Sequence, residues 1–295
     1  MAQKTVRCPH CGQTFSVPET VPVAVCPYCG TAIWLGTGEV FREHFMYPVR
    51  HEYNSAYKLA IGVASRQYEA PERLEIDASP TAGLLHFVPL YLYRVRVRAE
   101  CPGNPEAGLE ESWENRLATS SPPKGLPESY VFPSRGRQFF EPKILERGKY
   151  YQPDIDPKSL ISEVSSKASI KALREAFNWC EKPKIVNETV WQGIVHYPFW
   201  EIRYSYMGEE YYALVDAAGG RVVYLEYPIG STKRATLVMA AAGIMGISAL
   251  LGALVGSSLD APLAGLAGGV IGSVPGSAVY LRSGVKRRGI YRLVG

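Results

Sequence analysis

Charge is missing from the most apolar part of this 295-residue chain. Residues 235–258 and 261–281 contain no Asp, Glu, Lys, Arg or His. Proton relays and ion pathways need ionisable groups within the membrane, so this absence argues against a pump or channel built from these segments. Each stretch reaches the roughly 20 apolar residues that a helix needs to cross a hydrocarbon core. We therefore predict a transmembrane helical hairpin over residues 235–281.

Basic residues flank this hairpin on both outer sides. Lys233 and Arg234 precede it and the basic tail 282–295 follows it, whereas the link carries only Asp260. Because Lys and Arg stay on the cytoplasmic side, we expect two spans in the cell (inner) membrane with both termini cytoplasmic. Residues 1–30 lack the apolar core of a signal peptide, which agrees with this orientation. The alternative, a buried helix pair in a soluble core, fits poorly because neither stretch has a polar face.

The rest of the chain also lacks a basic surface for nucleic acid. The formal net charge is +4, but residues 233–295 contribute +6, which leaves −2 for residues 1–232. Residues 1–40 are neutral and have no Lys/Arg stripe to meet phosphates. A membrane-tethered nucleic-acid-binding protein is therefore an alternative function that the charge distribution disfavours.

Known catalytic signatures are absent as well. The chain has no G-x-S-x-G, no H-E-x-x-H, no phosphate-binding loop and no dinucleotide fingerprint. His86 and His196 each precede a proline in similar segments, and this equivalence suggests a structural role. We predict no enzyme activity, with an uncharacterised membrane-bound enzyme as a further alternative.

Four of the six cysteines do form a motif. Cys8 and Cys11 lie in Cys-Pro-His-Cys-Gly, and Cys26 and Cys29 lie in Cys-Pro-Tyr-Cys-Gly. Both sulfurs of such a knuckle face one ion, and the glycine permits the positive φ that brings backbone N–H groups near the thiolates. Four thiolates in a tetrahedron suit a closed, structural Zn²⁺ site. We predict a zinc ribbon over residues 1–40 with these four cysteines as metal ligands.

Other readings of this motif stay open. The knuckles also resemble those of rubredoxins, which implies iron as a minor alternative, although the spacing is shorter and few aromatic residues are present. His10 could compete as a ligand, but an exposed residue between two ligands is the simpler interpretation. Ile33, Trp34 and Leu35 are candidates to anchor the ribbon to the next domain.

Cys101 and Cys180 stand outside the motif. Because cytoplasmic thiols stay reduced, we expect no disulfide between them. Leu173, Ala176, Phe177 and Cys180 have the spacing of an apolar helix face, so Cys180 is expected to be a small buried hydrophobe.

Residues 45–100 and 150–230 resemble each other and indicate a duplication. The segment PLYLYR from Pro89 matches PFWEIR from Pro198, and each predicts a long strand that begins at its proline. Each copy starts with a predicted helix.

In the first copy, Asn54 or Ser55 caps the helix and Pro71 stops it. In the second copy, Asp156 is the N-cap and Pro157 is the first helical residue. Helices followed by antiparallel strands predict an α+β fold.

The second copy ends in a predicted β-hairpin with its turn at Gly219 and Gly220. The hairpin within residues 196–228 is similar to that of PepSY-type domains. This resemblance implies a small α+β module that binds or holds a partner, without an active site.

A different composition separates the two copies. Residues 101–149 are rich in Pro, Gly, Ser and Glu, which predicts a long connection that is partly mobile. We expect its apolar islands, 130–133 and 139–140, to pack on the body. Recognition of another protein is the alternative role for these islands.

Glycines recur at fixed spacing in both spans, as in a glycine zipper. They are Gly252 and Gly256 in the first span, and Gly268, Gly272 and Gly276 in the second, with Gly265 and Gly269 beside these. Small residues four apart let helices approach closely. One glycine face would close the hairpin and another would contact neighbouring chains in a homo-oligomer. A proline in the second span predicts a kink.

Together these patterns predict an α+β protein with an N-terminal zinc ribbon, a duplicated body and a C-terminal membrane hairpin. The knuckles and the hairpin resemble little-characterised prokaryotic membrane proteins that carry an N-terminal zinc ribbon. We expect a membrane-anchored scaffold or adaptor that contacts membrane lipid. Its ribbon and body would bind another membrane or cytoplasmic protein subunit at the cytoplasmic face.

Overall fold

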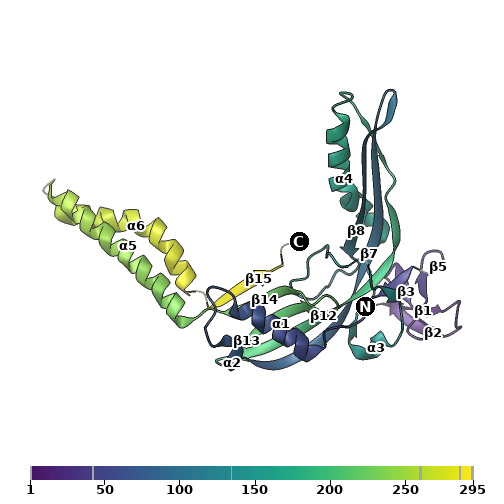
Figure 1. The fold of residues 1–295 in the computed structure, drawn as a ribbon, viewed down its shortest axis with the longest axis horizontal. Coiled ribbons are helices and arrows are strands. Elements are labelled where there is room, and N and C mark those ends of the chain that lie inside the picture. Colours follow the sequence, from purple (N-terminus) through teal and green to yellow (C-terminus); the bar gives the residue numbers. More distant parts are fainter. Residues whose placement is uncertain (1, 42, 134, 259–260, 286, 294–295) are drawn as a thin grey trace.

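The computed structural model describes residues 2–41, 43–133, 135–258, 261–285 and 287–293. It shows a mixed helix-and-sheet protein with three parts, namely a four-cysteine module (residues 2–41), a ten-stranded main sheet and two long C-terminal helices (Figure 1). The predicted charges at Asp260 and Lys286 lie outside the described residues.

The four-cysteine module consists of two small sheets, each with one cysteine knuckle at a turn. Strands β1 (Gln3–Arg7) and β2 (Thr14–Pro18) form an antiparallel hairpin. Strands β3 (Val23–Val25), β4 (Ala32–Trp34) and β5 (Val40–Phe41) form the second sheet. The module lies at one end of the main sheet, opposite the C-terminal helices (Figure 1).

Two long antiparallel strands form the centre of the main sheet. They are β7 (Ser79–Cys101) and β12 (Val190–Tyr206), and Val88 pairs with Tyr197. Aligning the two prolines of the predicted repeat also makes Val88 and Tyr197 equivalent. The two strands therefore pair within one sheet about residues that the predicted repeat makes equivalent.

Both prolines lie inside these strands, so the prediction that each strand begins at its proline is wrong. The outer neighbour of β7 changes from β10 (Lys149–Tyr150) to β8 (Asn104–Leu117) at Pro89. The outer neighbour of β12 changes from β6 (His44–Met46) to β13 (Glu209–Asp216) around Pro198. Proline has no backbone N–H to donate to a neighbouring strand. Each of the two prolines lies where one outer partner strand ends and the next begins, so no hydrogen bond of the sheet is lost there.

Four further strands complete the main sheet. They are β9 (Gln138–Phe139), β11 (Lys184–Asn187), β14 (Val222–Pro228) and β15 (Arg288–Arg292), and β14 lies between β13 and β15. Strands β13 and β14 form the predicted hairpin. Strand β15 pairs with β14, so part of the predicted basic tail is an edge strand of the sheet.

Short and medium helices cover parts of this sheet. They are α1 (Tyr53–Ser65), α2 (Leu74–Asp77), α3 (Ile144–Arg147), the 3₁₀ turn η1 (Pro157–Leu160) and α4 (Ile161–Ala176). The N-cap of α1 is Glu52, slightly before the predicted caps. Asp156 does cap the second copy's helical segment, because its Oδ1 accepts the N–H of Lys158 at 3.0 Å.

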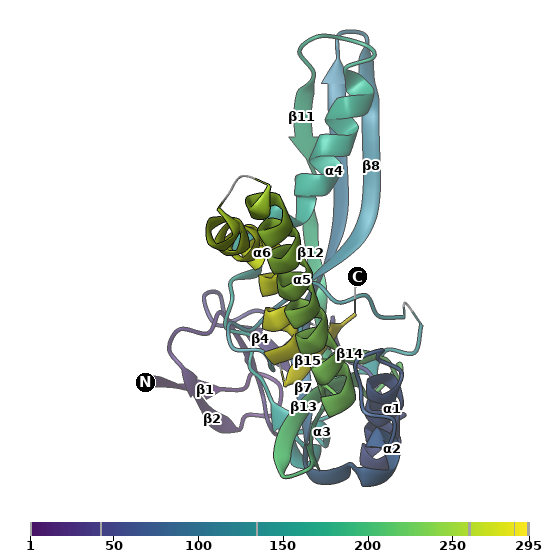
Figure 2. The same cartoon turned by 90° about the vertical axis from the view of Figure 1, so that its left-hand side faces the viewer.

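The far halves of β7 and β8 form an arm with β11 and α4 (Figures 1 and 2). The first part of the predicted connection 101–149 is therefore the long strand β8, Asn104–Leu117. Helix α4 buries Val164 and Ala172 against the arm. A Cβ on Gly108 would lie 2.0 Å from the carbonyl oxygen of Ala172, so only glycine permits this close packing.

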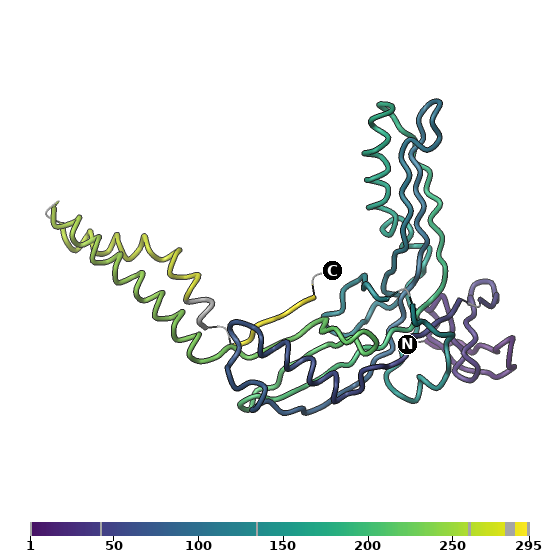
Figure 3. The backbone as a smooth tube through the Cα atoms, viewed as in Figure 1, coloured from purple at the N-terminus to yellow at the C-terminus, as the bar shows by residue number. Residues whose placement is uncertain are grey.

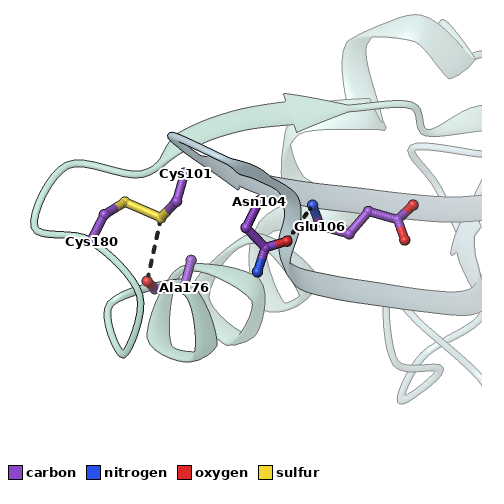
Figure 4. Close-up of a disulfide and its surroundings, with 5 residues drawn as sticks. All are labelled: Cys101, Asn104, Glu106, Ala176 and Cys180. Atoms are coloured by element: carbon purple, nitrogen blue, oxygen red, sulfur yellow. Dashed lines mark hydrogen bonds between the residues drawn. A yellow bond between two sulfur atoms is a disulfide. The ribbon is translucent and has the colours of Figure 1, made fainter.

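A disulfide between Cys101 and Cys180 joins β7 to the segment after α4 at the tip of the arm (Figure 4). The expectation that both thiols are free is therefore wrong. Their Cα atoms lie 5.9 Å apart across a sequence separation of 79 residues, which only the folded arm brings together. The predicted apolar face is confirmed at Ala176, which is buried, but it is wrong at Phe177, which is 58% exposed.

The apolar islands of the connection pack on the body through some of their residues. Tyr130 is buried and donates its hydroxyl to the buried Asp216 Oδ2 at 2.8 Å. Phe140 stacks on the ring of His44. Val131 and Phe139 remain exposed.

Two apolar helices project from the far end of the main sheet (Figures 1 and 3). Helix α5 (Ser231–Ser257) and helix α6 (Pro262–Val285) are both long and apolar enough to cross a membrane. Only 6% and 11% of their most apolar windows are buried, which does not fit a buried pair in a soluble core. Helix α6 contains Pro275 and bends along its length (Figure 3).

Glycines close the contact between α5 and α6. A Cβ on Gly252 would lie 2.2 Å from the carbonyl oxygen of Gly265, and one on Gly269 would lie 2.1 Å from that of Ser248. A Cβ on Gly256 would lie 2.6 Å from the carbonyl oxygen of Ala261 and 2.8 Å from the Cα of Gly265. The predicted second-span series is outside this contact, since a Cβ on Gly268, Gly272 or Gly276 would meet no atom within 4 Å.

Candidate metal centre

The four motif cysteines converge in the four-cysteine module. Their sulfur atoms all lie within 4.8 Å of one another. Cys8 Sγ is 3.6 Å from Cys29 Sγ, and Cys11 Sγ is 3.7 Å from Cys26 Sγ. A tetrahedron with metal–sulfur bonds of about 2.3 Å has sulfur–sulfur edges of about 3.8 Å. These thiolates therefore fit a single tetrahedral metal ion.

Each knuckle has the backbone conformation that the sequence predicts. Gly12 has φ +77° and Gly30 has φ +75°, a region that side-chain-bearing residues rarely adopt. The N–H of Gly12 donates to the carbonyl of Cys8 and the N–H of Gly30 donates to that of Cys26, both at 2.9 Å. The turns are thus closed by local hydrogen bonds that fix the direction of the sulfurs.

In both knuckles the first cysteine is buried and the residue before the second cysteine is exposed. Cys8 and Cys26 are buried, whereas His10 is exposed and lies outside the ligand group. The position between the second pair, Tyr28, is 59% exposed. The outer side of the centre therefore presents one aromatic and one imidazole side chain to the surroundings.

The inner side of the module packs on the main sheet. Trp34 and Phe41 contact Trp191 edge-on, with ring centroids 5.2 Å and 5.0 Å apart. Val25 belongs to the same buried cluster as Tyr91 of β7. Trp34 thus anchors the module, as predicted, whereas Ile33 belongs to the module's own core.

A histidine pair continues this contact from the second knuckle into the sheet. His44 Nδ1 lies 3.1 Å from the Gly30 carbonyl oxygen, and His44 Nε2 lies 3.0 Å from His196 Nδ1. His196 Nε2 lies 3.3 Å from the Tyr151 carbonyl oxygen. Both ends of this series are carbonyl oxygens, which only accept hydrogen bonds. For all three contacts to be hydrogen bonds, the two imidazole rings together must carry three N–H protons. Two neutral imidazoles carry only two.

Burial keeps both rings neutral at neutral pH. It lowers the pKa of His44 to about 4, against the opposing effect of the Gly30 carbonyl. Burial and then the charge of His44 hold the pKa of His196 well below its usual range. One of the three contacts therefore lacks its proton near neutral pH, and acid would supply that proton to a buried site.

His86 is not equivalent to His196, which corrects the sequence-based interpretation. His86 pairs with Phe199 and His196 pairs with Pro89, and this odd offset places the two rings on opposite faces of the sheet. His86 contacts the hydroxyl of Tyr151 at 2.8 Å and Glu201 Oε2 at 3.1 Å. Burial lowers its pKa, although Glu201 acts in the opposite direction.

A polar cavity of about 300 Å³ lies beside Glu201. Its two most buried carboxylates are each paired with cations, Glu201 with Arg203 and Glu226 with Lys124 and Arg288. The arrangement is a charge-balanced network on the face of the sheet. The sequence gives no sign of it, because its members come from distant segments.

Comparison with protein families, curated proteins and solved structures finds no significant match. The spacing of the cysteines revealed the centre itself. The histidine pair was missed because His44 and His196 are 152 residues apart and only strand pairing unites them.

Proposed function

We propose that this protein is a membrane-anchored scaffold or adaptor whose four-cysteine module and sheet bind a protein partner at the membrane surface. One observation carries the proposal: the unburied α5–α6 pair and the four-cysteine module lie at opposite ends of one main sheet (Figure 1). The module exposes Tyr28 and His10 from its knuckles. A partner at the knuckles would be held beside the membrane without contacting it directly.

The metal centre is proposed to be a structural zinc ribbon. Four thiolates leave no open coordination position, which favours Zn²⁺ in a closed site. Binding of a structural zinc contributes on the order of 10–16 kcal/mol in zinc-finger peptides. The module buries few residues of its own, including Phe15, Val17 and Ala24, so the metal would supply much of its stability.

A cytoplasmic orientation is proposed for the sheet and the four-cysteine module. Lys233 and Arg234 before α5 and the basic residues after α6 support it. The Cys101–Cys180 disulfide opposes it, because disulfides persist mainly in oxidising compartments. The redox state of this pair in the cell therefore decides between the two orientations.

Two measurements test the scaffold. The full chain should remain in membrane vesicles after a carbonate wash, because α5 and α6 span the bilayer. In those vesicles, Tyr28→p-benzoylphenylalanine should yield a photo-crosslinked protein adduct of one defined mass.

The same replacement at Ile76, which is 75% exposed on α2, is the matched control and should not give that adduct. Release by carbonate would refute membrane anchoring. Equal adducts at both positions, or none at Tyr28, would refute partner binding at the knuckles.

A further inference from the structure

A cavity of about 710 Å³ lies at the base of the α5–α6 hairpin. Its walls come from the segment between α1 and α2, the turn between β12 and β13, the start of α5, and Arg287 after α6. The N–H of Ile229 donates to the Arg287 carbonyl at 3.0 Å, which ties the two helix bases together. If α5 and α6 span a bilayer, this cavity lies at the depth of the lipid headgroups.

The cavity lining has more positive than negative side chains when those that form ion pairs with each other or with residues outside the cavity are left out of the count. The lining contains Arg73, Lys233, Arg234, Arg287, Glu72, Asp77 and Glu209. Arg73 pairs with Asp77 at 3.3 Å, and Glu209 pairs at 3.3 Å with Arg288, which lies outside the cavity. Among the described lining residues, three cations outside these pairs remain against one carboxylate, Glu72. The cations are Lys233, Arg234 and Arg287. The cavity thus favours an anion.

Arg234 supplies a donor that lacks an acceptor. Its Nε is buried and makes no hydrogen bond to any described residue. A buried guanidinium nitrogen without a partner costs free energy that an acceptor would recover. Phosphate oxygens match the planar fork of an arginine and form short, charge-assisted hydrogen bonds with it.

The start of α5 adds further donors. This 27-residue helix begins after Gly230, and no side chain caps it. The first N–H groups of a helix have no intrahelical acceptor, and they carry the positive end of the helix dipole. The first turn of α5 lines the same cavity as Arg234, so both sets of donors serve one volume.

Exposed apolar side chains border this cationic site. Met207 lines the cavity, is 85% exposed and sits in the left-handed region with φ +49°. Tyr68 is 82% exposed, and Lys233 Nζ lies 4.2 Å from its ring centroid. Aromatic rings with adjacent cations are typical of the boundary between headgroups and acyl chains. These neighbours favour a lipid over a soluble anion.

We propose that this cavity binds the phosphate headgroup of an anionic phospholipid through Arg234, Arg287 and the free N–H groups at the start of α5. Met207 and Tyr68 contact the adjoining acyl region. The bound lipid fixes the angle at which the hairpin leaves the sheet, because the cavity contacts both. This inference rests on the membrane anchoring proposed above.

The test uses the full chain in mild detergent. Native mass spectrometry measures the retention of added phosphatidylglycerol and phosphatidylcholine, with and without inorganic phosphate. The wild-type chain should retain phosphatidylglycerol preferentially. Each of Arg234→Gln and Arg287→Gln should lower that retention about fivefold, which corresponds to about 1 kcal/mol per basic residue near a membrane surface.

Two control variants separate site binding from general charge. Lys58→Gln removes an exposed cation of α1 outside the cavity and should leave retention unchanged. Glu72→Gln removes the opposing carboxylate and should raise phosphatidylglycerol retention, a gain that misfolding does not produce.

The outcomes separate this inference from membrane anchoring. Equal retention in wild-type and both arginine variants would overturn the lipid site, even if the chain resists carbonate. Displacement of phosphatidylglycerol by inorganic phosphate would assign the cavity to a soluble anion and also overturn it. Release of the wild-type chain by carbonate would instead refute the anchoring on which it rests.

Discussion

His44 and His196 face each other across β6 and β12, with His44 Nε2 3.0 Å from His196 Nδ1. Both rings are buried. The other ring nitrogen of His44 contacts Gly30, the residue that follows Cys29 of the candidate metal centre. The pair therefore joins the second knuckle to the centre of the main sheet, and its protonation should affect how the module docks.

Acid should destabilise the folded protein through His44. Its pKa is about 4 when folded, against an ordinary value of 6.5. The unfolded chain therefore binds more protons between these values, and stability falls as the pH drops from 6.5 toward 4. The shift corresponds to about 3 kcal/mol. Thermal unfolding of the wild type and His44→Asn across this range measures it.

The variant should show a weaker dependence on pH than the wild type over the same range. Metal loss in acid affects both proteins, so the difference between them isolates the histidine. Parallel profiles for the two proteins would contradict the assignment.

Removing one thiolate should abolish metal binding. We expect Cys26→Ser to lower zinc affinity by more than the roughly 10–100-fold that loss of an outer-shell partner causes. Residues 2–41 should then lose protection from hydrogen exchange, while the parts of β7 and β12 around Val88 and Tyr197 keep theirs, because that buried cluster contains no residue of the module. Elemental analysis and hydrogen exchange measure the two effects.

His10→Ala is the matched control, because His10 lies in the first knuckle but outside the ligand group. It should keep the metal at wild-type stoichiometry. Loss of metal from this variant would make His10 a ligand and contradict the four-thiolate site.

A thiol count should reveal the redox state of the arm. Cells are quenched with a thiol-alkylating reagent, and the alkylated cysteines of the denatured, metal-free chain are counted. Four alkylated cysteines of six would show that the disulfide persists in the cell and would refute the cytoplasmic orientation. Reduction should then release Cys101 and Cys180. Alkylation of all six before reduction would show that the pair is reduced in the cell, and would support the cytoplasmic orientation.

Loss of the disulfide should loosen the arm. Disulfides that close long loops typically contribute about 2–4 kcal/mol. Cys101→Ser should therefore increase hydrogen exchange where β7, β11 and α4 meet. The four-cysteine module, which is remote from the tip (Figure 1), should keep its exchange rates. Unchanged exchange in the arm would show that packing of α4 alone holds it.

Glycines in the α5–α6 contact should differ from those outside it. Gly265→Ala places a Cβ 2.2 Å from the Gly252 carbonyl oxygen and should destabilise the hairpin by about 1–3 kcal/mol. Gly268→Ala meets no atom within 4 Å and should be neutral. Thermal stability in detergent compares them, and equal effects would contradict the observed contact.

Features that depend on near neighbours were readable from the sequence. The knuckles follow from C-x-x-C spacing followed by glycine, and Gly12 and Gly30 have the predicted positive φ. Asp156 before Pro157 predicted the cap of the second helical segment. The charge-free runs predicted two long apolar helices. In each case the energetics involve residues only a few positions apart.

Tertiary structure alone decided the contacts between distant segments. Strand register set His86 and His196 on opposite faces, because a one-residue offset reverses the direction of a side chain. It also joined Cys101 to Cys180 and placed Pro89 and Pro198 at gaps between partner strands. Local spacing fixes knuckles, caps and apolar runs, whereas register and helix packing depend on the whole chain and leave no short-range signal.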